Sequence, residues 1–250
     1  MVIDVSDGLG IACLWVYSNF TLFLIAFLIA LYINFNFNTV MVGLIYLLPL
    51  IPAGLEAENA VRFLIVSFQN TVFGLIELVL FVITVRSADA AFDKSHIKQL
   101  IGHTLPIAAA LMGLSFISRM TLIPVTWVEL GAIMLVFFAG SILRVIATYQ
   151  MGARFKFDIV FREEQTLKTD QLYATMRHPS YTAMMLVILA YAMNTHQWII
   201  GGIGLALAWL GFQYRIYHEE NALKQQFGEE YLKYHSNAGM WFPKLGGAGK

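Results

Sequence analysis

The sequence predicts an all-α, polytopic integral membrane protein, and two observations carry this prediction. Of the 250 residues, 58% are hydrophobic and only 13% are charged, whereas soluble domains usually carry about 25% charged residues. The apolar residues also form long runs, several of them close to the roughly 20 residues that a bilayer-spanning helix needs. The formal net charge is zero, which argues against a nucleic-acid-binding surface. Cys13 is the single cysteine, so we expect neither a disulfide framework nor a metal site.

The apolar runs predict about seven transmembrane helices, within a range of six to eight. Five runs come first, at residues 11–33, 38–55, 61–85, 103–119 and 122–148. Two shorter runs, 180–195 and 197–213, form a helical hairpin with Asn194-Thr195-His196 at its tip. We divide the chain into N-terminal transmembrane helices, residues 1–140, and a membrane-associated core with a C-terminal tail, residues 141–250.

The placement of Lys and Arg predicts the orientation in the membrane. Basic residues are frequent in the segment 86–102 and from residue 149 onward. With seven spans and the N-terminus outside, both segments face the cytosol, as the positive-inside rule requires. We therefore expect the endoplasmic reticulum membrane in a eukaryote, or the inner membrane in a bacterium, with the polar stretches facing the cytosol.

Two carboxylates and one arginine in the predicted spans are informative. Glu77 and Glu129 lie within apolar runs, where a charge is costly and often marks function. A protonated or paired carboxyl near a helix end is the simpler interpretation, and the roles of both residues stay open. Arg144 lies at the inner end of the fifth span, where we expect its side chain to extend toward water.

Two long polar stretches, residues 149–179 and 214–244, flank the hairpin. Because a hairpin returns the chain to the same face of the membrane, the two stretches should meet in space. We expect this to gather a set of polar side chains at the membrane–cytosol boundary: Tyr173, His178, Tyr181, Arg215, His218, Glu219 and Glu220.

The residues around Arg215 and Pro179 have the local features of a binding site. If the last span continues as a helix, Arg215 and Glu219 share one face at a spacing of four residues, and a guanidinium there can grip a carboxylate. Pro179 favours the start of a new helix, which puts Arg177 and His178 at a helix N-terminus, a place suited to anions. The alternatives are an ordinary surface ion pair and a simple helix start.

The C-terminal stretch predicts an amphipathic helix on the membrane surface. Glu229-Glu230-Tyr231-Leu232-Lys233-Tyr234 alternates charged and aromatic residues. We expect Tyr231, Tyr234, Trp241 and Phe242 to act as interfacial anchors, as aromatic residues do at membrane boundaries.

Taken together, these motifs resemble the isoprenylcysteine carboxyl methyltransferase family over about residues 140–245. The matching residues are Leu143-Arg144, Tyr173, Arg177-His178-Pro179-Ser180-Tyr181, Asn194, Arg215, Glu219-Glu220, and Phe227-Gly228-Glu229-Glu230-Tyr231. The sequence departs from the family at two positions where the family usually has glycine, Gln171 and Ala183.

What the resemblance implies is methyl transfer from S-adenosylmethionine to the carboxylate of a C-terminal prenylated cysteine. The cofactor would be bound by Gln165, Thr166, Leu167, Lys168, Tyr173, His178, Pro179, Ser180, Tyr181 and Glu219. Arg215 matches the arginine that binds the substrate carboxylate, and it is the implied catalytic residue. The implied partners are a prenylated cysteine protein, or a small prenylcysteine or lipid substrate, together with membrane lipid and without nucleic acid.

Two other functions remain open from the residues themselves. A phospholipid N-methyltransferase of the phosphatidylethanolamine type would need a base such as Glu220 or His218 to deprotonate its amine substrate, and Arg215 would repel that amine. A seven-span transporter or lipid-binding protein would place its functional charges near the bilayer midplane, where Glu77 is the only support.

Overall fold

The described part of the chain is built from helices packed side by side. The computed structural model describes residues 9–33, 35, 37–51, 60–84, 98, 100–152 and 166–244. The helices are α1 (Leu9–Ile33), α2 (Phe37–Leu47) with the 3-10 turn η2 (Leu48–Leu50), α3 (Ala60–Thr84), the π-helix η4 (Leu100–Thr104), α5 (Leu105–Met120), α6 (Trp127–Met151), the 3-10 turn η6 (Gln171–Ala174), α7 (Pro179–Asn194), α8 (Trp198–Phe227) and α9 (Glu229–Asn237). These ranges contain no β-strand, which confirms the predicted all-α fold.

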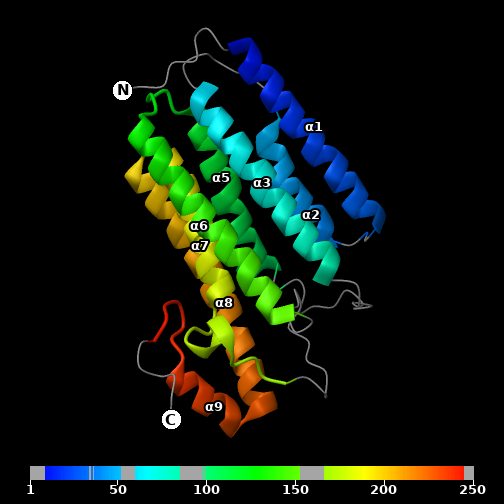
Figure 1. Cartoon of the computed structure of the whole chain (residues 1–250), viewed down its shortest axis with the longest axis vertical. Coiled ribbons are helices and arrows are strands. Elements are labelled where there is room, and N and C mark those ends of the chain that lie inside the picture. The colour runs from blue at the N-terminus through cyan, green and yellow to red at the C-terminus, as the bar shows by residue number, and fades with distance from the viewer. Residues whose placement is uncertain are drawn as a thin grey trace.

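Helices α1 to α8 form an elongated bundle, and α8 extends beyond its neighbours at one end (Figure 1). We call this end the tail end, because α9 and the C-terminal tail pack there. The opposite end is the tip end, where the turn Thr195–Gln197 joins α7 to α8. The predicted hairpin of α7 and α8 is therefore confirmed.

Four helices in the described ranges are long and apolar enough to cross a membrane. They are Val61–Leu80, Leu100–Met120, Trp127–Met151 and Trp198–Phe227, and Asn19–Ile33 and Thr39–Leu50 are shorter apolar helices. Large apolar side chains such as Leu135 and Ile199 are exposed on the outside of the bundle, as lipid contact requires. The polytopic membrane fold is confirmed, and the count of seven spans stays a prediction.

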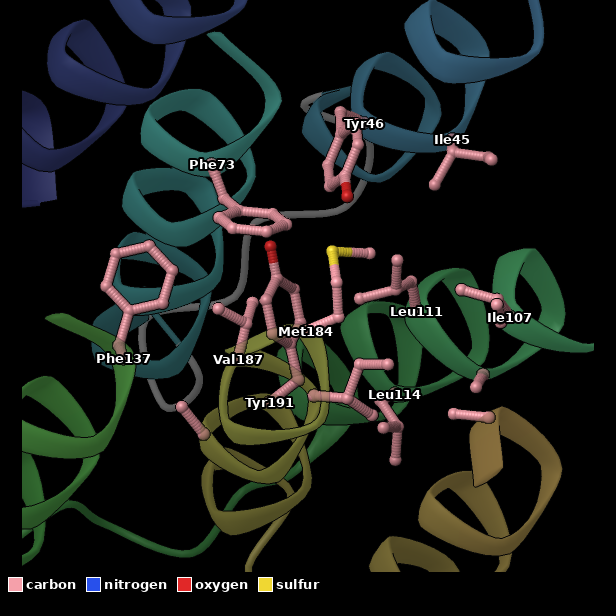
Figure 2. Packing of buried hydrophobic residues seen from close by; sticks show 14 of the residues in the cluster. Ile45, Tyr46, Phe73, Ile107, Leu111, Leu114, Phe137, Met184, Val187 and Tyr191 are labelled. Carbon is pink, nitrogen blue, oxygen red and sulfur yellow. The ribbon is translucent and has the colours of Figure 1, made fainter. Parts of the chain in front are cut away.

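A buried aromatic cluster joins the first helices of the chain to the last ones (Figure 2). Tyr46 of α2 lies edge-on to Phe73 of α3 at 6.0 Å between ring centroids, and Phe73 lies edge-on to Phe137 of α6 at 6.5 Å. Tyr191 of α7 is fully buried in the same cluster. The N-terminal helices thus pack directly against the α6–α7 pair, which carries part of the predicted site.

Helices α6 and α7 approach closely at Gly140. A Cβ atom at this position would lie 2.8 Å from the carbonyl oxygen of Ala183, so a larger residue would push the helices apart. Ala183 is fully buried and fits this contact although the family usually has glycine there. The close packing fixes the start of α7 relative to α6.

The ionisable residues of the predicted spans are paired. Arg144 donates to both carboxylate oxygens of Glu77, at 2.7 and 3.0 Å, and also contacts the Ser180 hydroxyl. Arg144 is only 4% exposed, so the expectation that it extends toward water is wrong. The reason is that α3 supplies a carboxylate opposite it, and a buried pair satisfies both charges inside the bundle.

Glu129 is paired at the tip end of the bundle. Its Oε1 atom lies 3.0 Å from Nη2 of Arg62 and 3.1 Å from Nδ1 of His196. The interpretation of Glu77 and Glu129 as paired carboxyls is confirmed.

Candidate functional site

The segment that enters α7 is held by the C-terminal tail. Pro179 occupies the first turn of α7, which confirms the predicted helix start. The backbone N–H groups of Arg177 and His178 donate to the carbonyls of Gly239 and Met240, at 2.7 and 3.2 Å. The tail therefore occupies the backbone donors just before the helix, and the side chains of this segment are left to form the site.

Two adjacent carboxylates of α8, Glu219 and Glu220, connect that helix to the segment that enters α7. Arg215 Nε donates to Glu219 Oε1 at 2.8 Å, and the Tyr181 hydroxyl donates to the same oxygen at 2.6 Å. Because α8 continues to Phe227, the predicted spacing of Arg215 and Glu219 on one helix face is confirmed.

The second carboxylate, Glu220, accepts hydrogen bonds from the residues that precede α7. Arg177 Nε donates to Glu220 Oε1 at 2.8 Å, and His178 Nε2 lies 3.1 Å from the same atom. Glu219 and Glu220 thus face two neighbouring sets of donors. The predicted convergence of the two polar stretches is confirmed for Arg177, His178, Tyr181 and the two carboxylates.

Aromatic rings line the site beside the carboxylates. The His178 ring stacks on Tyr181 with 5.5 Å between centroids, and Tyr181 stacks on Phe212 at 5.2 Å. Trp241 of the tail lies edge-on to Phe212 at 6.2 Å. Aromatic faces and carboxylates both attract cations, so this arrangement favours a positively charged organic ligand.

One buried donor near the stack has no acceptor of its own. The indole nitrogen of Trp241 is buried and finds no hydrogen-bond acceptor among the described residues. A buried indole N–H normally has a partner. A polar ligand at this site would supply one.

The C-terminal tail is fastened over the site by Arg177 and two hydroxyl groups. The Arg177 guanidinium donates to the carbonyls of His235, at 3.0 Å, and Ala238, where α9 ends. The Tyr234 hydroxyl donates to the Tyr173 carbonyl at 2.8 Å, and the Thr182 hydroxyl donates to the Trp241 carbonyl at 2.7 Å. The tail is therefore one wall of the site.

The aromatic residues of the tail differ from the predicted surface anchors. Tyr231 is buried, so its expected role as an interfacial anchor is wrong. It lies on the face of α9 that packs against the protein, because the chain turns back after α8 and lays α9 over the end of that helix. Burial raises the pKa of the Tyr231 and Tyr234 hydroxyls, so both stay neutral. Phe242 is 76% exposed and is free to meet lipid.

Tyr173 connects the loop before α7 to α6. Its hydroxyl donates to the Ala147 carbonyl at 3.1 Å, and burial raises the pKa of this hydroxyl. The Leu172 N–H donates to Gln150 Oε1 at 3.1 Å. Tyr173 is thus placed close to the site, but its hydroxyl is directed into α6.

The loop expected to bind a cofactor is only partly described. Gln165 lies outside the described residues. Thr166, Leu167 and Lys168 lie before η6 in chain without regular secondary structure, and Lys168 pairs with Asp170 at 2.7 Å. The basic group of Lys168 therefore contacts its own loop.

Gln171 explains why glycine is usual at its position. Its φ angle is +57°, in the left-handed region that side chains with a Cβ rarely adopt. Glycine would take this conformation without strain. The turn that leads into Tyr173 therefore has a positive φ angle at a residue that adopts this conformation less readily than glycine.

Three features of the site were not expected from the residues alone. His218 is exposed and packs against Tyr214 and Tyr217 of its own helix. Phe212 and Trp241 complete the aromatic stack although neither belongs to a motif. The Ser180 hydroxyl contacts Arg144. Arg144 and Glu77 carry opposite charges in apolar spans, a signal that could have predicted their pairing.

The fold and the site define a polytopic helical membrane protein with a cluster of charged and aromatic side chains near the tail end of its bundle. Residues 132–225 match the sequence model of the isoprenylcysteine carboxyl methyltransferase (ICMT) family. The resemblance predicted from the motifs is therefore confirmed for this part of the chain.

Two individual relatives are similar over half of the chain or less. Protein-S-isoprenylcysteine O-methyltransferase of Homo sapiens is 32% identical over 130 residues, which are 49% of this chain and 44% of that protein. Protein-S-isoprenylcysteine O-methyltransferase B of Arabidopsis thaliana is 36% identical over 101 residues, 38% of this chain and 49% of that protein. The matches thus span about half the length of these curated relatives.

The similarity in fold extends over nearly the whole chain. A solved structure described as the eukaryotic intramembrane Ras methyltransferase ICMT matches with a TM-score of 0.55 and 17% sequence identity. The match covers 92% of this chain and 86% of that chain. The N-terminal helices therefore share the fold of that protein although the family's sequence pattern begins only at residue 132.

Proposed function

We propose that this protein is an S-adenosylmethionine-dependent methyltransferase that esterifies the C-terminal carboxylate of a prenylated cysteine. The observation that carries the proposal is the contact of Arg215 and Tyr181 with one oxygen of Glu219. This group lies inside the region that matches the family. The Arg215 guanidinium could bind the carboxylate of the acceptor. The aromatic rings and the glutamate carboxylates beside it could bind the positively charged methyl donor.

The reaction needs positioning more than acid–base chemistry. S-adenosylmethionine supplies an electrophilic methyl group on a positively charged sulfur. A C-terminal carboxylate has a pKa of about 3.5 and is already ionised at neutral pH, so no residue has to remove a proton. Holding two reactants in line can supply about 7–11 kcal/mol. Opposite charges disappear as the new ester forms, and a site shielded from water favours that change.

The residues present fit a cationic cofactor. His178, Tyr181 and Glu219 would hold it, the rings by stacking and the carboxylate by its charge. The unpartnered indole N–H of Trp241 offers one further donor. Of the remaining expected binding residues, Pro179 starts α7, and Gln165, Thr166, Leu167 and Lys168 stay proposed cofactor ligands.

Two of the expected cofactor ligands would act indirectly. The Tyr173 hydroxyl is bound to Ala147, and the Ser180 hydroxyl is contacted by Arg144. Both residues thereby hold the walls of the site in place. This support fixes where His178 and Tyr181 lie.

Arg215 is the residue that we assign to the acceptor. Glu219 holds the guanidinium through Nε, and a guanidinium can bind a ligand carboxylate with two parallel hydrogen bonds. A prenyl chain would reach this point from the lipid, along the apolar outside of the bundle. The Lys and Arg distribution supports an orientation with the tail end facing the cytosol, in the membrane of the endoplasmic reticulum or the bacterial inner membrane.

A phospholipid N-methyltransferase is less well supported. Its amine acceptor needs a free base, whereas Glu220 is bound by Arg177 and His178 and His218 packs on its own helix. A transporter is disfavoured for a similar reason, because the carboxylate of Glu77 is neutralised by Arg144.

The test is to incubate the purified protein in lipid with methyl-labelled S-adenosylmethionine and one of two acceptors. Farnesylcysteine should acquire base-labile label, as a methyl ester does, and phosphatidylethanolamine should acquire none. Base-stable label on phosphatidylethanolamine would favour the N-methyltransferase instead. Absence of label on both acceptors would overturn the methyltransferase assignment.

A further inference from the structure

A π-helical turn from the N-terminal region lies against α8 just before Arg215. The turn η4 comprises Leu100–Thr104, and π-turns are rare and frequent at functional sites. Two glycines allow the approach. A Cβ at Gly211 would lie 2.9 Å from the His103 carbonyl oxygen, and a Cβ at Gly102 would lie 2.5 Å from the Tyr214 ring. Backbone of η4 therefore touches backbone of α8 at this point.

His103 makes a hydrogen bond across this contact. Its Nδ1 atom lies 3.2 Å from the carbonyl oxygen of Gly211. Because a carbonyl oxygen only accepts, Nδ1 must carry the hydrogen, and Nε2 of the neutral ring carries none. In an α-helix the carbonyl of Gly211 also accepts the backbone N–H of Arg215. One carbonyl thus connects His103 with the helical turn that presents Arg215.

The His103 ring also contacts the aromatic stack of the site. Its centroid lies 5.8 Å from that of Phe212 and 6.5 Å from that of Tyr181. Tyr181 is the residue whose hydroxyl shares Glu219 Oε1 with Arg215. His103 therefore contacts both sides of the Arg215 group, through the backbone of α8 and through the Tyr181 ring.

We propose that His103 is a positioning residue for Arg215, and that the N-terminal region contributes through it to the geometry of acceptor binding. The inference rests on the proposed function. It extends that function beyond residues 132–225, which contain the family's sequence pattern. The hydrogen bond to Gly211 fixes the rotation and height of the turn 211–215, and with it the direction of the guanidinium.

The proposal predicts that loss of the His103 side chain lowers kcat/KM for the acceptor and leaves the affinity for the cofactor unchanged. In His103→Ala the turn loses a fixed partner, and kcat/KM for farnesylcysteine should fall roughly ten- to hundred-fold, as misplaced groups in active sites do. The dissociation constant of the cofactor, measured by calorimetry on the full chain in lipid nanodiscs, should not change, because His178, Tyr181 and Glu219 remain.

Two amide substitutions test the hydrogen bond itself. The amide nitrogen of His103→Asn reaches the position of Nδ1, so this variant should recover most of the lost kcat/KM. The amide of His103→Gln reaches the position of Nε2 and should not recover it. Leu114→Ala serves as the matched control, because Leu114 packs on Gly204 elsewhere in the α5–α8 contact. It should lower the melting temperature and leave kcat/KM per folded molecule unchanged.

The outcomes separate this inference from the proposed function. Failure of the wild-type protein to methylate farnesylcysteine would overturn the proposed function and this inference with it. With an active wild type, equal activity of His103→Ala, equal rescue by Asn and Gln, or an equal loss in Leu114→Ala would overturn the positioning role alone.

Discussion

The two ends of the α7–α8 hairpin carry clusters built from the same kinds of residue, and they differ in what those residues contact. The tip cluster comprises Arg62, Glu129, Asn194 and His196. The tail cluster comprises Arg177, His178, Tyr181, Arg215, Glu219 and Glu220. In the tip cluster, Arg62 donates to the carbonyls of Ile123 and Asn194, each at 2.7 Å, and to Glu129 at 3.0 Å.

The acceptors distinguish Arg62 of the tip cluster from Arg215 of the tail cluster. Arg62 is fully buried, and two of its bonds go to backbone carbonyls of the α5–α6 connection and the end of α7. It fastens three segments of chain and offers nothing to a ligand. In the tail cluster, Arg215 and Tyr181 share a side-chain carboxylate beside an aromatic stack. Side chains can exchange a partner for a ligand, whereas backbone carbonyls are committed to the fold.

The largest expected effect is on the tail cluster, in Arg215→Ala. Loss of a positioned charge at a reacting group typically costs roughly a hundred- to a thousand-fold in kcat. We expect methyl-ester formation on farnesylcysteine to fall by that factor, with cofactor affinity and melting temperature little changed. Arg215→Lys keeps the charge and loses the fork, so it should recover only part of the activity. Full activity in Arg215→Ala would show that Arg215 does not bind the acceptor carboxylate.

The matching change in the tip cluster, Arg62→Ala, should act on stability. It leaves two buried carbonyls without their donor and leaves Glu129 with His196 but without its arginine. Breaking a buried ion pair typically costs about 3–5 kcal/mol. Thermal unfolding in lipid should show a clear drop in melting temperature, with activity per folded molecule preserved. The double variant Arg62→Ala, Glu129→Ala removes the orphaned charge and should be less destabilised. A selective loss of activity would contradict the division between the clusters.

A smaller effect, on cofactor affinity, should distinguish the residues of the tail cluster that bind the cofactor from those that bind the acceptor. His178→Ala removes the ring stacked on Tyr181 and one partner of Glu220. The contact that we propose between the His178 ring and the cofactor would be worth about 1.5 kcal/mol, so we expect cofactor affinity to fall roughly tenfold. Calorimetric titration with S-adenosylmethionine measures this directly. An unchanged affinity would assign His178 to folding alone, and His196→Ala of the tip cluster provides the comparison.

The smallest effect concerns the support of the tail cluster at Gln171. Because glycine adopts a positive φ without steric cost, Gln171→Gly should stabilise the protein by up to about 1 kcal/mol. Gln171→Ala removes the side-chain atoms beyond Cβ but keeps Cβ and with it the strain, so it should not be stabilising. Melting temperatures of the two variants give the comparison. A lower melting temperature for the glycine variant would show that the side chain of Gln171 matters more than the strain.

The sequence predicted the features that depend on local pattern. Apolar runs located the starts of the helices within a few residues, whereas α8 continues to Phe227, well beyond the run that ends at residue 213. The hairpin explained why Arg177 and Glu220 meet although 43 residues separate them. The spacing of Arg215 and Glu219 followed from helical periodicity. The sequence motifs that lie near the predicted membrane boundary therefore identified the main residues of the tail cluster.

Features that depend on a distant partner were not predictable in the same way. Arg144 is buried because Glu77 lies 67 residues away on another helix, and Tyr231 is buried because α9 folds back on α8. The tail pairs through backbone atoms of Gly239 and Met240, which leave no trace in side-chain pattern. His103 reaches the site through a π-turn that no periodicity indicates.

The length of α8 has a consequence for how activity has to be measured. The helix has 30 residues, and at 1.5 Å per residue Arg215 lies roughly 26 Å along its axis from Trp198, close to the thickness of the hydrocarbon layer of about 30 Å. An acceptor with a lipid chain reaches this depth only by diffusing within the bilayer. Its rate of methylation should therefore follow its mole fraction among the lipids, and diluting the acceptor with inert lipid at constant bulk concentration should slow the reaction.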